Sequence, residues 1–286
     1  MDPQFFTFLS SLWGVFNSNF WAALAGAFAG AVAASRFAAR QEARDDFERK
    51  INEINAAISI SYSACEAYIT HKQGLIDRLT DAYRSEMTAY GVAKPQQETE
   101  TKPVQATGVR DISLSLMEST VLVVQCSALQ ELVFKIPSTA NIIRLVSILS
   151  HRNSVLNSCM AQRNELIRTM NLMDQSERLA LYFGLARKDG FVDKTYPYLI
   201  EALSELSSDC IFFSWLVCEL LAAEALKVRD GRNWLPAVVP VSFQDPVAAG
   251  LVPNPHDYLG WHKLAPRWQE LAIPLYDKYL SPVRGD

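Results

Sequence analysis

The sequence predicts an all-α protein in which an N-terminal transmembrane helix continues into a cytoplasmic antiparallel helical bundle and then an extended, proline-rich C-terminal arm. Three observations predict this class. Residues 3–35 contain no ionisable side chain, apolar residues then recur at helical spacing as far as residue 230, and eight of the 13 prolines lie from Pro236 onward. Helical periodicity sustained over long segments favours helices packed on helices.

The candidate transmembrane helix begins after the polar residues 17–19, which are good helix caps. Residues 20–39 supply the roughly 20 apolar or small residues that are needed to cross about 30 Å of hydrocarbon. Arg36, Arg40 and Arg44 follow as a basic edge, and the positive-inside rule places this edge in the cytoplasm and the N-terminus outside. Residues 1–40 are therefore expected to hold an interfacial segment and a single-pass helix in an inner or plasma membrane.

This helix is built from the smallest side chains, because ten of the sixteen residues from 20 to 35 are glycine or alanine. Ala22, Gly26, Gly30 and Ala34 recur every four residues and so share one face of a helix. In lipid, small residues let helix backbones approach closely, and that packing drives helix association. The row predicts a homo-oligomer, with the lipid bilayer and other copies of the chain as partners.

Residues 20–39 are also compatible with a buried helix or a cleaved signal peptide. An alanine-rich helix suits the interior of a soluble protein, since alanine contributes little to membrane insertion. A signal peptide would account for the small residues AVAAS, but Asp2 stands where a positive segment is expected and the apolar run begins late.

Residues 41–93 are expected to form a long juxtamembrane helix of coiled-coil type, followed by a polar linker over residues 94–114. Apolar side chains recur every seven residues in two rows, broken by Lys72 and Glu86, and Gly91 is a typical helix-ending residue. The rows consist of Ile51, Ile58, Cys65 and Leu79, and of Tyr62, Ile69, Ile76, Tyr83 and Tyr90.

Residues 115–235 are predicted to be the helical bundle, with helices near 115–135, 138–173, 175–187 and 194–230. Residues 236–286 combine many prolines with Trp261 and Trp268, and Trp234 lies just before them. Aromatic rings bury large apolar areas, so they would hold this segment against the bundle as an extended arm.

A polar face on the predicted helix 138–173 calls for a physical cause, because isolated charges beside an apolar stripe are costly to bury. Three interpretations stay open: internal salt bridges with partners such as Glu66 or Glu224, a polar oligomer interface or channel lining, and an anion or nucleotide pocket. The residues of this polar face are Arg152, Asn157, Arg163, Asn164, Arg168 and Asn171.

Most catalytic signatures are absent from the sequence, which has no glycine-rich phosphate loop, no HExxH and no GxSxG. With four histidines and no cysteine pair at metal-ligand spacing, we expect neither a metal nor a cofactor. The five cysteines are an odd number and are expected to be reduced thiols. The net charge of −4, without a basic block, gives no strong nucleic-acid signal.

Arg144 and His151 are separated by six residues, a spacing that resembles the RNase motif of HEPN-domain proteins. The resemblance covers these two residues, and it implies a helical-bundle RNase in which both side chains are catalytic. Leu145 stands where that family commonly has a polar residue.

The function that the sequence favours is a non-enzymatic, membrane-anchored oligomer. It would be a scaffold or effector whose clustered helices can open the bilayer and whose cytoplasmic bundle binds an unknown protein or small molecule. The layout resembles that of small membrane effectors in bacterial antiviral defence. The alternatives are a membrane-tethered HEPN-like RNase and a soluble helical interaction domain with a buried N-terminal helix.

Overall fold

The structure, a computed structural model, describes residues 21–91, 118, 122, 124–136, 140–256 and 266–280. These residues are mostly helical and contain no β-strand. The interfacial segment expected before residue 20, the linker over residues 94–114 and Trp261 lie outside the described residues. In chain order the elements are α2 (Trp21–His71), the π-helical turn η2 (Lys72–Ile76), α3 (Asp77–Tyr90), α4 (Cys126–Lys135), α5 (Ala140–Asn171), α6 (Gln175–Phe183), α7 (Thr195–Arg229), α8 (Gln244–Ala248) and α9 (Pro266–Leu280).

The first three elements form one long rod that runs from Trp21 to Tyr90, as the apolar spacing predicts. The π-helical turn interrupts the α-helical hydrogen bonds, and the backbone N–H of Asp77 donates to the carbonyl of Lys72 five residues earlier. The rod ends at Gly91, whose φ of 75° lies in the left-handed region that glycine adopts without strain.

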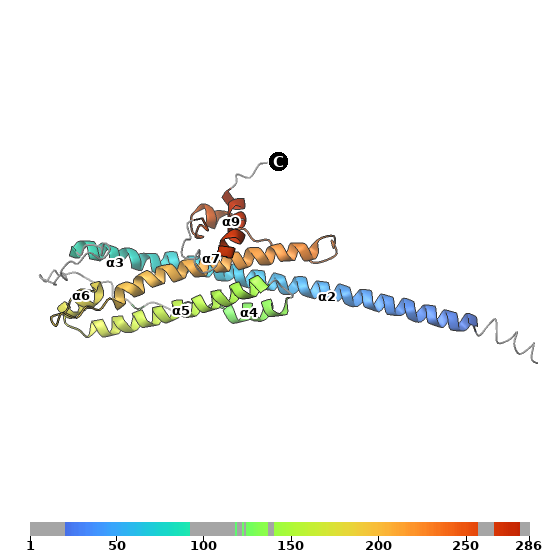
Figure 1. The fold of residues 1–286 in the computed structure, drawn as a ribbon, viewed down its shortest axis with the longest axis horizontal. Coiled ribbons are helices and arrows are strands. Elements are labelled where there is room, and N and C mark those ends of the chain that lie inside the picture. The colour runs from blue at the N-terminus through green and yellow to red at the C-terminus, as the bar shows by residue number, and fades with distance from the viewer. Residues whose placement is uncertain are drawn as a thin grey trace, which may run out of the picture.

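The bundle is organised around α7, of whose 35 residues twenty are buried. Figure 1 shows α7 running antiparallel to α2 on one side and to α5 on the other, with α4 beside α5 and α2. The Ser61 hydroxyl on α2 donates to the Ser214 carbonyl on α7 at 2.8 Å, so the two backbones approach closely at this crossing. The core therefore draws on residues 51–90 as well as on the predicted bundle 115–235.

The proline-rich C-terminal segment is only partly extended. Residues 244–248 and 266–280 are helical, and α9 lies across α7 (Figure 1). Trp268, Ala272 and Tyr276 recur every four residues and are buried, which gives α9 an apolar face toward the bundle. Pro266 starts α9, where its missing N–H costs no helical hydrogen bond, whereas Pro274 lies inside the helix and is exposed.

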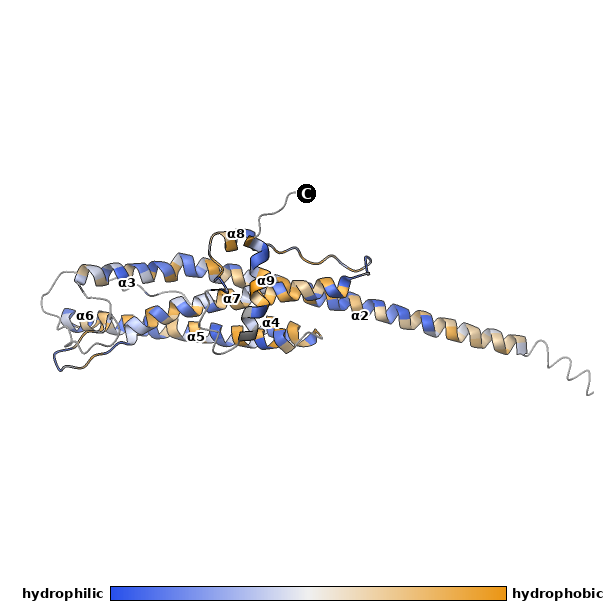
Figure 2. Cartoon of the chain, turned by 45° about the horizontal axis from the view of Figure 1, so that its top comes forward, coloured by the Kyte–Doolittle hydropathy of each residue, from blue (hydrophilic) through white to orange (hydrophobic). Residues whose placement is uncertain are grey.

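The outer part of α2 stands apart from the rest of the molecule. It projects beyond the bundle (Figures 1 and 2), and no residue of α2 before Ile51 is buried. We call residues 21–44 the stem. Figure 2 shows apolar residues along the outer part of this stem and hydrophilic ones nearer the bundle.

Candidate functional site

The stem is the first candidate site, because it is apolar and is not covered by the described parts of the chain. Among the described residues, one helix is long and apolar enough to cross a membrane, and its most apolar 18-residue window has a mean hydropathy of 1.4. None of that window is buried. Large side chains are exposed along the stem, namely Trp21, Leu24, Phe28 and Phe37. Extended apolar surfaces of this kind commonly mark sites of contact with a membrane or another protein.

The small-residue row on the stem is open to contact. Ala22, Gly26, Gly30 and Ala34 are all exposed, and a Cβ atom added at either glycine would meet nothing within 4 Å. The glycines therefore serve no packing within the described part of the chain. The row offers a smooth flank to a neighbouring helix.

Two cation–π contacts hold the bundle against the base of the stem. The Arg44 guanidinium lies 4.7 Å from the centre of the Trp234 ring, and that of Arg232 lies 4.2 Å from the Phe47 ring. Arg232 and Trp234 belong to the loop after α7, whereas Arg44 and Phe47 belong to α2. In one contact the helix supplies the arginine and the loop the aromatic ring, and in the other the roles are reversed. Both contacts stabilise the point where the stem leaves the bundle.

The predicted polar face on α5 divides into separate contacts. Arg152 pairs with Asp209 on α7, at 3.3 Å between Nε and Oδ2. Arg168 is exposed and holds Glu118 with two hydrogen bonds of 2.9 and 2.7 Å. Of the asparagines, Asn164 is buried, Asn157 is half-buried and Asn171 is exposed.

Arg163 belongs to an aromatic cluster at the end of the bundle away from the stem. Its side chain is fully buried, and its guanidinium lies 5.8 Å from the centre of the Tyr196 ring. Tyr196 stacks on Tyr182 at 4.6 Å, and the Tyr182 hydroxyl donates to the Glu86 carboxylate. Burial raises the pKa of Tyr196, while the nearby positive charge of Arg163 opposes that rise. The tyrosine pair therefore lies between a cation and a carboxylate and remains protonated.

The residues of the HEPN-like pair lie two turns apart on α5 and are both exposed. The Arg144 guanidinium lies 5.9 Å from the centre of the Trp268 ring, which is buried where α9 meets the bundle. His151 faces solvent. The described surroundings of the pair are an exposed helix surface, and RNase activity stays a prediction.

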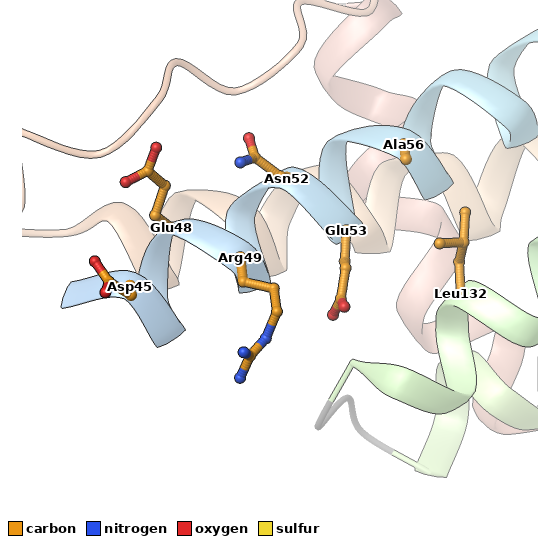
Figure 3. Close-up of a pocket in the computed structure, with 7 residues that line it drawn as sticks. All are labelled: Asp45, Glu48, Arg49, Asn52, Glu53, Ala56 and Leu132. Atoms are coloured by element: carbon orange, nitrogen blue, oxygen red, sulfur yellow. The ribbon is translucent and has the colours of Figure 1, made fainter. Parts of the chain in front are cut away.

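A groove of about 560 Å³ lies between α2 and α4. Figure 3 shows Arg49 and Glu53 directed toward the α4 side, where Leu132 lies, whereas Glu48 and Asn52 point the other way. Because these polar groups do not converge, the groove is an open charged surface rather than a binding pocket.

No metal or reactive-cysteine site is evident among the described residues. There, no three His, Cys, Asp or Glu side chains are placed to hold a metal ion. All five cysteines are free thiols, and burial raises the pKa of Cys65 to about 12, which keeps it protonated.

Lys72 and Glu86, which interrupt the seven-residue row of apolar side chains along the rod, make polar contacts with other helices. Neither was predicted from the sequence to be a site residue. Lys72 donates to Ser208 on α7 at 2.7 Å, and Glu86 accepts from Tyr182. A third, Glu219, is almost fully buried on α7 and binds both Lys278 and Tyr279 of α9. A charged residue within an apolar row could have predicted a buried polar contact for the first two. No such pattern in the neighbouring sequence predicts the contacts of Glu219.

No protein-family model, curated protein or solved structure matches this chain.

Proposed function

We propose that the protein is a membrane-anchored scaffold or effector that assembles through its stem and presents its helical bundle to a cytoplasmic partner. One observation carries the proposal: an apolar 18-residue window of α2 lies entirely outside the core formed by the chain's own helices. Such a surface needs a cover, and a lipid bilayer supplies one over its whole circumference.

The residue types of the stem suit this role. Trp21, Leu24 and Phe28 provide apolar area for insertion, and the glycines provide a flank for association. Arg36 and Arg40 are exposed at the bundle end of the stem, a position from which long side chains reach phosphate headgroups. This charge bias supports a single-pass orientation with the bundle in the cytoplasm and the N-terminus outside.

The competing function is a soluble interaction domain. It requires a cover for residues 21–40, and among the described residues the later helices do not provide it. A soluble protein would then need another polypeptide at the same surface, and cell fractionation separates that case from the membrane proposal.

The test begins with carbonate-washed membranes from cells that express the full chain. We expect the protein to stay in the pellet, whereas a soluble or peripheral protein is released. Size and symmetry are then measured in detergent for the wild type and for the double variant Gly26→Leu, Gly30→Leu. The bulky side chains should separate the helices and reduce the oligomer to monomer.

A matched control distinguishes loss of the flank from added bulk. Ser35→Leu places the same side chain about 180° around the helix from Gly26 and about 140° from Gly30, at about 100° per residue. It should leave the oligomer intact. Dye leakage from liposomes then separates an effector that opens the bilayer from a scaffold that does not. Release of the protein by carbonate would refute the proposal, and an unchanged oligomer in the glycine variant would refute the assembly surface.

A further inference from the structure

A second hollow lies on the bundle, away from the stem, where four parts of the chain meet. Its volume is about 230 Å³. The end of α2, the turn η2 with the start of α3, the middle of α7 and the loop after α8 all contribute to its walls. The residues that matter to its chemistry are Ile69, Lys72, Asp77, Ser208, Ile211 and Leu251.

Lys72 is the central group of this cavity, and it occupies a position that faces the core. Ile51, Ile58 and Cys65 precede it at intervals of seven residues, and all three are fully buried. Its amine donates to the Ser208 hydroxyl at 2.7 Å and lies 4.0 Å from the Asp77 carboxylate. Ser208 in turn donates to the Ser204 carbonyl at 3.0 Å, which directs its lone pairs toward Lys72.

The backbone is irregular on both sides of the cavity. The π-helical turn starts at Lys72, and such turns occur frequently at functional sites although they weaken the helix. On the other side, Gly250 has a φ of 68°, which returns the chain across α7 after α8. The turn brings Leu251 to the cavity, and the buried Val252 beside it anchors the loop.

From this geometry we infer that the cavity binds a small organic monocarboxylate. The carboxylate accepts from the Lys72 amine, which Ser208 holds in place by accepting one of its hydrogen bonds, and the apolar body lies against Ile69, Ile211 and Leu251. Burial lowers the pKa of Lys72, which shows that its charge is only partly solvated, and an ammonium group has three N–H donors, of which one goes to Ser208. A ligand carboxylate supplies a further charged acceptor. The inference concerns the bundle alone and stands whether or not the stem enters a membrane.

Charge and size set the ligand class. One ammonium group and one carboxylate already face each other across the cavity, so a monoanion adds one negative charge, while a phosphate dianion adds a repulsive excess beside Asp77. The volume holds about eight water-sized groups at roughly 30 Å³ each. Hexanoate and benzoate are of this size.

The experiment titrates the purified full chain in detergent with hexanoate, benzoate, inorganic phosphate and hexylamine, and follows ligand signals by NMR. Both carboxylates should bind, with at least a tenfold loss of affinity in Lys72→Met. Lys227→Met is the matched control, since Lys227 is exposed at the far end of α7, and it should bind as the wild type does. Binding that is equal in wild type and Lys72→Met would overturn the inference, as would a preference for phosphate or hexylamine.

A measurement on the wild type guards against a variant that fails to fold. An amine-acylating reagent is applied with and without benzoate, and the acylation of each lysine is followed by mass spectrometry. Benzoate should slow acylation of Lys72 and leave that of Lys227 unchanged. If Lys72 reacts at the same rate in saturating benzoate, the carboxylate does not bind there.

Discussion

Two stretches of the same helix behave in opposite ways. In the stem, residues 21–44, no side chain is buried, whereas from Ile51 to Ile69 the side chains that face α7 are nearly all inaccessible. Both stretches are continuous α-helix. The helical backbone is thus shared, and the side chains determine which surroundings each stretch requires.

The difference lies in the kind of apolar residue. The buried stretch uses Ile51, Ile54 and Ile58, whose branched side chains fill space against α7. The stem uses alanine and glycine on the flank that could meet a neighbour, and it keeps larger rings such as Phe28 elsewhere. A core packed in water needs volume, and a helix pair in lipid needs close approach. The two cation–π contacts at Arg44 and Phe47 mark the change from one to the other.

The largest effect should come from placing a charge in each stretch. Ile58→Asp buries a carboxylate in the core and should cost about 4 kcal/mol or more of the free energy of unfolding. Ala27→Asp lies in the exposed stem, so the bundle should melt like the wild type while the protein is lost from carbonate-washed membranes. Thermal unfolding in detergent and membrane fractionation of both variants check the pair. Equal melting temperatures for the two would remove the distinction between stem and core.

An effect of intermediate size on stability is expected in the bundle, where α9 packs on α7. Glu219→Ala removes the acceptor of Lys278 and Tyr279 and should cost about 1–3 kcal/mol locally. Hydrogen exchange over residues 266–280 should accelerate, while exchange over the core of α2 stays slow. Glu270→Ala, an exposed position on α9, serves as the control. Unchanged exchange in Glu219→Ala would mean that the apolar face alone holds α9.

The smallest effect is expected at the exposed pair of Arg168 and Glu118. Arg168→Met should leave the melting temperature at pH 7 close to that of the wild type, because solvent screens exposed ion pairs. The Arg168 hydrogen bond lowers the pKa of Glu118, so any stabilisation is present above the ordinary carboxyl pKa and is lost as the pH falls through the lowered value. Melting curves of wild type and variant between pH 3 and pH 7 should therefore converge at the acid end. A large difference in melting temperature at neutral pH would show that the pair stabilises the fold more than an exposed ion pair normally does.

The helices were predictable because their signals are local. The predicted helix 138–173 is observed as Ala140–Asn171, and the predicted helix 194–230 as Thr195–Arg229. The partners of polar groups were less predictable, since they depend on which helices meet. Arg152 takes Asp209, which no spacing along α5 could indicate. The helical part of the C-terminal segment was also missed, because the prolines masked the four-residue spacing of Trp268, Ala272 and Tyr276.

The most direct test of the membrane claim is to ask which residues touch acyl chains. The full chain is reconstituted in liposomes that contain a lipid with a photoreactive group in its acyl tail, and cross-linked residues are mapped by mass spectrometry. We predict adducts within residues 21–40 and none within residues 51–69. Adducts that are absent from residues 21–40, while the reconstituted bundle remains folded, would contradict the account.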